Sequence, residues 1–170
     1  MNNQADKARF QLLVIEDNPA DVQLLRLALD VAEVNCELTV IEDGAEALAL
    51  FKRQGKYACA PKPDLVVLDL NLPKYGGLEI LEAARETAEF ADLPIAVLSS
   101  SSSPRERAKL EALGMARYLT KPADLEQYLG VGRIIRELLA GERQQSESGV
   151  KSSRRTALSL AQSIIIQDGE

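Results

Sequence analysis

Acidic side chains follow two apolar runs that have the character of buried strands. Asp69 comes directly after residues 65–68, and Glu16 and Asp17 come directly after residues 12–15. Because the carboxyl ends of strands in an open α/β sheet meet at one edge, where such sheets bind ligands, we expect the three carboxylates to lie close together. Crowding raises the pKa of at least one carboxyl group unless a cation shares the site. A hard divalent ion, most commonly Mg²⁺, would relieve that repulsion, and the pattern therefore indicates phosphoryl chemistry.

Two further polar residues follow predicted strands at the same edge. Ser99 is the first polar residue after the apolar run of residues 94–98. Lys121 follows a short predicted strand at residues 117–119 and precedes a proline. A loop serine and a loop lysine are usually just solvated, so each residue taken alone is a weak signal. Their shared edge with the three acids makes the combination specific.

The other members of the set also have simpler explanations. Asp69 could be a surface acid at the end of a strand, and Glu16 and Asp17 could stabilise a helix start through the helix dipole. Tyr118 is most simply interpreted as a core aromatic residue. Asn18 already supplies a helix N-cap, however, which leaves Asp17 available for another role.

Strand and helix patterns alternate through the middle of the chain. Strands are predicted at residues 11–16, 36–41, 64–69, 94–98 and 117–119. Helices are predicted at residues 19–31, 43–51, 78–88, 104–114 and 124–140, the last weakened by Gly130 and Gly132. Five strands alternating with five helices predict an α/β fold, a doubly wound parallel sheet with helices on both faces.

Composition excludes several classes of protein. The chain has 170 residues and a net charge of −6, which argues against a nucleic-acid-binding face. It contains no histidine, and this excludes Ser-His-Asp hydrolases, Cys-His proteases and His-ligated zinc sites. Any phosphohistidine chemistry must therefore be supplied by a partner.

The chain shows no sign of a membrane or secreted protein. No apolar run approaches the roughly 18 residues of a membrane span, and the polar residues 1–9 do not resemble a signal peptide. The two cysteines, Cys36 and Cys59, imply no disulfide framework. We therefore expect a cytoplasmic protein.

We divide the chain into three parts. Residues 1–9 form an N-terminal extension, residues 10–140 the folded domain and residues 141–170 a C-terminal tail. The tail begins as a polar, Ser- and Gln-rich linker and ends in a short apolar segment, which we expect to dock on its own domain or on a twin subunit. It is too short for a DNA-binding output domain.

The order and spacing of these residues resemble the bacterial response-regulator receiver domain. An acidic pair follows the first strand, an Asp follows the third, a Ser comes thirty residues later and a Lys-Pro pair comes fifty-two residues after the Asp. The matching segments are residues 14–18 (Val-Ile-Glu-Asp-Asn), 68–73 (Leu-Asp-Leu-Asn-Leu-Pro), 98–100 (Leu-Ser-Ser) and 118–122 (Tyr-Leu-Thr-Lys-Pro). The longer loop before the third strand and the lack of an output domain resemble stand-alone regulators paired with phytochrome-type kinases.

The resemblance implies a fold and a set of roles. The fold would be flavodoxin-like, with strand order 2-1-3-4-5. Asp69 would accept a phosphoryl group from a sensor histidine kinase. Asp17, Glu16 and the backbone carbonyl of Asn71 would hold Mg²⁺ together with Asp69.

The resemblance also implies how the signal leaves the site. Lys121 would pair with the phosphoryl oxygens, Ser99 would hydrogen-bond to one of them, and Tyr118 would respond to the movement of Ser99. The Lys121–Pro122 peptide bond would be cis. The protein would signal by protein contact, with a possible homodimer through its fourth and fifth helices.

Two other functions fit parts of the pattern. A haloacid-dehalogenase-type phosphatase also forms an aspartyl phosphate, but it requires a second Asp two residues after the nucleophile, where this chain has Asn71. A pseudo-receiver would keep the fold as an unphosphorylated scaffold, and the complete set of Asp17, Asp69, Ser99 and Lys121 argues against it. We therefore predict a phosphoacceptor protein with at most intrinsic autophosphorylation and autodephosphorylation, and no other enzymatic activity.

Overall fold

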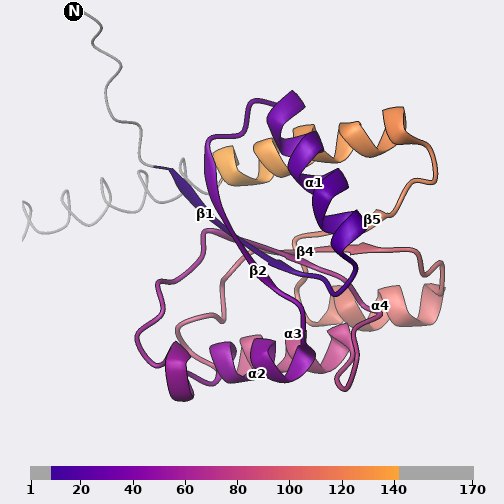
Figure 1. Cartoon of the computed structure of the whole chain (residues 1–170). Coiled ribbons are helices and arrows are strands. Elements are labelled where there is room, and N and C mark those ends of the chain that lie inside the picture. The colour runs from indigo at the N-terminus through magenta and orange to yellow at the C-terminus, as the bar shows by residue number, and fades with distance from the viewer. Residues whose placement is uncertain (1–8, 142–170) are drawn as a thin grey trace, which may run out of the picture.

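A five-stranded parallel sheet separates two layers of helices (Figure 1). The computed structural model describes residues 9–141. The strand order is β2-β1-β3-β4-β5 and every neighbouring pair is parallel. The strands are β1 (Phe10–Ile15), β2 (Cys36–Ile41), β3 (Leu65–Leu68), β4 (Ile95–Ser99) and β5 (Arg117–Thr120). The predicted fold class and strand order are confirmed.

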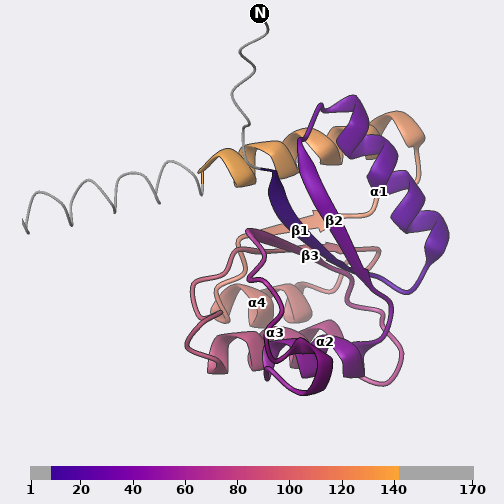
Figure 2. The same cartoon turned by 60° about the vertical axis from the view of Figure 1, so that its left-hand side comes forward.

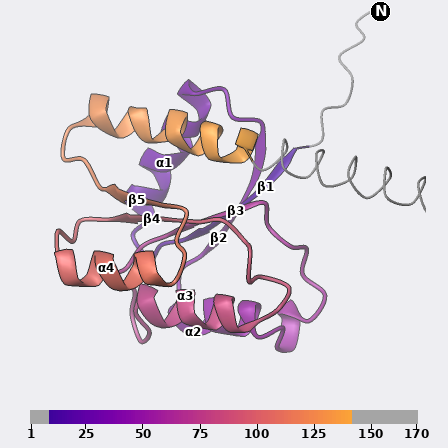
Figure 3. The same ribbon diagram turned by 180° about the vertical axis from the view of Figure 1, so that it is seen from behind.

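The helices cover both faces of the sheet (Figures 1 and 3). They are α1 (Pro19–Val31), α2 (Gly44–Phe51), α3 (Gly77–Glu86), α4 (Pro104–Ala112) and a helix over residues 125–141, where the described part of the chain ends. On one face, α1 and the 125–141 helix pack on side chains that include Leu12 and Val14. On the other, α2, α3 and α4 pack on side chains that include Leu13 and Ile15. Successive side chains of β1 thus point to opposite faces of the sheet and pack in different cores. Figure 2 shows both layers of helices from another side.

The predicted helix starts agree with the structure. The side chain of Asn18 accepts a hydrogen bond from the N–H of Ala20 at 3.0 Å, and Pro19 occupies the first turn of α1. Asp43 caps α2 in the same way, through the N–H of Ala45 at 2.6 Å. The side chain of Ser103 caps α4. These caps fix where each helix leaves the loop at the carboxyl edge of the sheet.

The ends of four strands differ by one residue from the prediction, and two of these differences concern residues of the site. Asp69 lies just beyond β3, because Leu68 is the last residue of that strand. Ser99 was predicted to follow β4 but is its final residue. It pairs in register with Thr120, and its carbonyl oxygen accepts a hydrogen bond from the N–H of Lys121 at 2.9 Å. The sheet ladder therefore extends one residue further and links Ser99 to Lys121 through the backbone.

Gly132 allows the 125–141 helix to approach α1 closely. A Cβ atom at this position would lie 2.0 Å from the carbonyl oxygen of Ala28. At Gly130, by contrast, a Cβ atom would meet nothing within 4 Å. The two glycines look alike in the sequence, but only Gly132 is required by packing.

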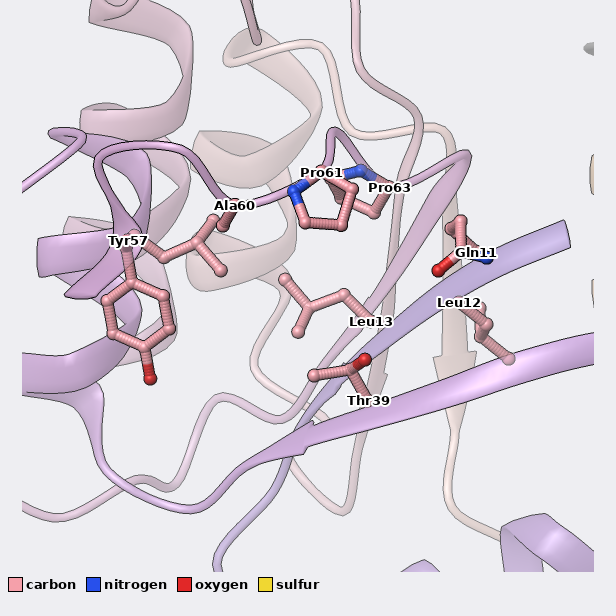
Figure 4. A pocket seen from close by; sticks show the side chains of 9 residues that line it. Gln11, Leu12, Leu13, Thr39, Tyr57, Ala60, Pro61 and Pro63 are labelled. Atoms are coloured by element: carbon pink, nitrogen blue, oxygen red, sulfur yellow. The ribbon is translucent and has the colours of Figure 1, made fainter.

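The segment between α2 and β3 folds over the opposite end of the sheet from Asp69. It contains a 3-10 turn (Gly55–Tyr57), and the guanidinium of Arg53 donates to the backbone carbonyls of Tyr57 and Ala60. Beneath it lies a small apolar cavity of about 90 Å³ (Figure 4). The cavity is lined by Gln11, Leu12, Leu13, Thr39, Leu50, Tyr57, Ala60, Pro61 and Pro63. It lies at the amino-terminal half of β1, away from the acidic residues that follow the strand.

The predictions for residues 1–8 and for the tail from residue 142 lie outside the described residues. Within residues 9–141, no helix has the length and apolar character needed to cross a membrane.

Candidate functional site

The sheet register brings three acidic side chains together at the carboxyl edge. Ile15 of β1 pairs with Leu68 of β3, so the residues that follow them leave the sheet side by side. Glu16, Asp17 and Asp69 each place a carboxylate oxygen within 4.8 Å of the other two. Glu16 and Asp69 are buried, whereas Asp17 is exposed.

Lys121 follows β5, the edge strand of the sheet, and its side chain reaches this cluster. Its Nζ atom lies 2.6 Å from Oε2 of Glu16 and 3.0 Å from Oδ2 of Asp69. A third contact, at 2.7 Å, is made to Oδ2 of Asp21 in the first turn of α1. An ammonium group has three hydrogens to donate, and these three carboxylates match that number. The lysine side chain is only 13% exposed, so the ion pairs are poorly screened by solvent.

Burial and ion pairing shift the pKa values of the charged groups in opposite directions. Burial raises the pKa of Glu16, and its hydrogen bond to Lys121 offsets part of that rise. Burial alone would lower the pKa of Lys121, but hydrogen bonds to Asp21, Glu16 and Asp69 raise it above its usual range. Lys121 is therefore a fixed positive charge in the cluster.

The two oxygens of Asp69 face different partners. Oδ2 faces Lys121, while Oδ1 accepts a hydrogen bond from the backbone N–H of Asn71 at 3.2 Å. The two oxygens of Glu16 also face different partners, because Oε2 faces Lys121 and Oε1 accepts a hydrogen bond from the N–H of Asn18 at 3.0 Å. Asn71 itself lies on the exposed loop that follows β3. Both buried carboxylates are thus oriented by backbone donors.

Glycine closes the loop that follows Asp69. A Cβ atom at Gly77 would lie 2.6 Å from the side chain and 2.9 Å from the Cα atom of Leu70. At Gly44, the first residue of α2, a Cβ atom would lie 2.7 Å from the carbonyl oxygen of Tyr75. The loop is therefore packed tightly between α3 and α2.

The cis bond implied for Lys121–Pro122 is absent, as are cis bonds elsewhere among the described residues.

Ser99 and Tyr118 are connected through Ser101. Ser99 is completely buried, and its Oγ accepts a hydrogen bond from the N–H of Ser101 at 3.2 Å. The hydroxyl of Tyr118 donates to the carbonyl oxygen of Ser101 at 2.7 Å. The hydroxyl of Ser101 in turn donates to Oε2 of Glu106, in the first turn of α4, at 2.6 Å. Tyr118 is half-buried, and its ring packs against the core as expected for a core aromatic residue. Its hydroxyl is instead hydrogen-bonded to the loop after β4.

Sequence reasoning missed two residues of this region, Asp21 and Ser101. Asp21 falls within the helix predicted at residues 19–31, and its position in the first turn of α1 places it beside the acidic pair that precedes the helix. That proximity was available in the sequence. Ser101 was one of five consecutive serines, and nothing in the sequence separates it from its neighbours.

Comparison with known proteins identifies the family. The sequence model of one protein family, the response regulator receiver domain, matches residues 12–131 of this chain. The chain belongs to this family. It is therefore the receiver domain of a response regulator in two-component signalling, a family whose members bind divalent metal ions and pair with sensor histidine kinases.

Similar proteins include stand-alone response regulators, and several solved structures among them are of phytochrome or bacteriophytochrome response regulators. The chain is 34% identical to response regulator Rcp1 of Synechocystis sp. over 115 residues, which is 68% of this chain and 78% of Rcp1. Among solved structures, the phosphorylated cyanobacterial phytochrome response regulator RcpA has a TM-score of 0.72 and 35% identity, covering 78% of this chain and 95% of RcpA. The Mn²⁺-bound form of Rcp1 has a TM-score of 0.69 and 32% identity, covering 74% and 91%.

The same domain also occurs within longer proteins. The chain is 36% identical to response regulator MprA of a Mycobacterium species, but it spans only 50% of that protein. It is 32% identical over 151 residues to the sensor histidine kinase TmoS of Ectopseudomonas mendocina and spans 14% of it.

Proposed function

We propose that the protein accepts a phosphoryl group on Asp69 from the phosphohistidine of a partner kinase. The observation that carries this proposal is the placement of Asp69, which is buried, oriented by the N–H of Asn71 and 3.0 Å from the ammonium of Lys121. A carboxylate in these surroundings is held in position for attack, with a positive charge beside it to receive negative oxygens.

The donor set fits a divalent cation. Three carboxylates gather at one point with no nitrogen or sulfur ligand among them, and oxygen ligands are those that Mg²⁺ prefers. We propose that Glu16, Asp17 and Asp69 hold Mg²⁺ together with the backbone carbonyl of Asn71. When bound, the ion neutralises charge on the attacking carboxylate and on the phosphoryl oxygens.

The covalent step forms one bond and breaks one. A carboxylate oxygen of Asp69 attacks phosphorus, the P–O bond forms, and the P–N bond to the partner's imidazole breaks with its electron pair returning to the ring. The chain contains no histidine, so the donor imidazole has to come from another protein. Lys121 stabilises the phosphoryl oxygens during transfer through its ammonium group.

The signal passes to α4 through the Ser99–Ser101 contact. A phosphoryl group on Asp69 adds about one to two negative charges at the edge of the sheet where Ser99 ends β4. Turning the Ser99 hydroxyl toward it breaks the bond that Ser99 makes with the N–H of Ser101. Ser101 also binds Tyr118 and Glu106, so its movement shifts the balance between two positions of the α4 start.

We further propose that the protein works in the cytoplasm and signals by protein contact. Both cysteines, Cys36 and Cys59, are free thiols, as expected in a reducing compartment. Of the residues of α4, only Leu110 is buried, which leaves most of this helix available to a partner or to a second copy of the chain. The relatives described as phytochrome or bacteriophytochrome response regulators favour a phytochrome-type kinase as the phosphoryl donor.

Phosphotransfer profiling tests this function. Purified histidine kinases labelled with radioactive phosphate are mixed with the protein and Mg²⁺, and transfer is followed over time. We expect rapid transfer from one phytochrome-type kinase, and no transfer to the Asp69→Asn variant. Equal labelling of this variant would show that the phosphoryl group goes elsewhere. Turnover of a generic phosphomonoester would favour a phosphatase instead.

A further inference from the structure

Asp21 gives Lys121 a partner outside the proposed metal ligands. Its Oδ2 lies 2.7 Å from Nζ, closer than the oxygen of Asp69 at 3.0 Å. It does not belong to the group of three carboxylates that could share a metal ion. We propose that Asp21 is a positioning residue that holds the Lys121 ammonium in the site while Glu16 and Asp69 engage the metal ion and the phosphoryl group. This inference rests on the function proposed above.

The fold fixes Asp21 more firmly than a loop residue. It lies in the first turn of α1, which begins at Pro19 behind the Asn18 cap. The hydroxyl of the buried Tyr128, from the 125–141 helix, lies 3.5 Å from the backbone carbonyl oxygen of Asp21. The Asp21 side chain is 24% exposed and so belongs to the wall of the site rather than to open surface. The carboxylate is thus presented to Lys121 by a helix with a defined start.

The need for such a residue follows from the hydrogen bonds of Lys121. In the structure its three donors meet Glu16, Asp21 and Asp69. Two of these acceptors are proposed metal ligands, and one of them becomes the phosphorylated residue. Lysine has a long, flexible side chain that loses rotamer entropy when it is ordered. With Asp21 still bound, the ammonium stays at the edge of the site and can turn one hydrogen toward the phosphoryl oxygens.

The test compares Asp21→Ala with Asp30→Ala. Asp30 is an exposed acid near the other end of the same helix, so its substitution matches the change in charge and in side chain. In EDTA, urea unfolding of the single variants and of each combined with Lys121→Met gives a double-mutant cycle. We expect Asp21 and Lys121 to be coupled by at least threefold in the unfolding equilibrium constant, and Asp30 and Lys121 to be uncoupled. Absence of coupling for Asp21 would overturn the inference.

A kinetic measurement then separates positioning from metal binding. At saturating Mg²⁺, labelling by acetyl phosphate should be at least threefold slower in Asp21→Ala, with the half-saturating Mg²⁺ concentration changed less than twofold. Asp21→Asn keeps an acceptor for Lys121 and should recover part of the rate. A rate equal to that of the unaltered protein, or a faster one, would contradict a positioning role. If the unaltered protein is not labelled at all, the proposed function fails, whereas labelling that is insensitive to Asp21 removes this inference alone.

Discussion

The Nζ atom of Lys121 lies 3.0 Å from Oδ2 of Asp69, although β4 separates the strands that carry the two residues. The lysine side chain reaches across the end of β4 to the carboxylate that follows β3. In the same position it reaches Glu16, after β1, at 2.6 Å. One ammonium group therefore connects the ends of three strands, and it lies beside the carboxylate that we propose as the phosphoacceptor.

Replacing Asp17 should weaken metal binding without unfolding the protein. Asp17 is exposed, yet it contributes an oxygen to the three-carboxylate cluster. Removing one charged ligand from a small oxygen site lowers affinity strongly. We expect Asp17→Asn to reduce Mg²⁺ affinity at least tenfold in isothermal titration calorimetry. Glu42→Gln is the matched control, because Glu42 is an exposed acid directly after β2. Equal affinity in both variants would remove Asp17 from the ligand set.

Alanine at positions 130 and 132 should have opposite effects on stability. At Gly132 a methyl group would collide with the backbone of Ala28 in α1, and we expect a loss of about 1–3 kcal/mol in the free energy of unfolding. At Gly130 the space is open, so Gly130→Ala should gain about 0.5–1 kcal/mol through helix propensity. Urea denaturation measures both. Two stabilised variants would mean that the helices are further apart than described.

Arg85 should be important for the stability of the α3–α4 side. Its guanidinium donates to the backbone carbonyls of Phe90, Leu93, Leu113 and Gly114 at 2.9–3.1 Å. Arg85→Met leaves these acceptors without their charged donor, and we expect a loss of about 2–3 kcal/mol. The exposed Arg105→Met is the control and should change stability by less than about 0.5 kcal/mol. Similar values for the two variants would contradict a role for Arg85 beyond that of a surface residue.

Stability should fall at alkaline pH because of Tyr128. Burial, with a smaller contribution from the charge of Asp21, raises the pKa of Tyr128 to about 12. The unfolded chain loses this proton near pH 10, so between pH 10 and pH 12 ionisation favours the unfolded state. Each pKa unit corresponds to about 1.4 kcal/mol, so the free energy of unfolding should decline by about 3 kcal/mol over this range.

Urea denaturation at stepped alkaline pH measures that decline. Tyr128→Phe should remove this part of the pH dependence, while the variant of an exposed tyrosine, Tyr75→Phe, should keep it. An unchanged slope in Tyr128→Phe would assign the decline to other groups.

The sequence predicted most of the sheet and the members of the acidic cluster, because these depend on local patterns. Continuous apolar runs mark strands that are covered on both faces, and polar residues directly after them must lie at one edge. The role of Gly132 could not be predicted, since it depends on how closely two helices approach. Ser101 was missed for a similar reason, because only the folded loop brings its carbonyl oxygen to the hydroxyl of Tyr118. The place of Asp21 beside Glu16 and Asp17 could be predicted from the start of α1, but its ion pair with Lys121 could not. Such contacts are decided by tertiary packing.

Labelling by acetyl phosphate shows whether Asp69 is the phosphoacceptor. The protein is incubated with acetyl phosphate and Mg²⁺, the acyl phosphate is trapped by borohydride reduction, and the modified residue is located by mass spectrometry. We predict modification at Asp69, dependent on Mg²⁺ and absent from Asp69→Asn. Modification at another residue, or equal labelling of Asp69→Asn, would show that Asp69 is not the phosphoacceptor.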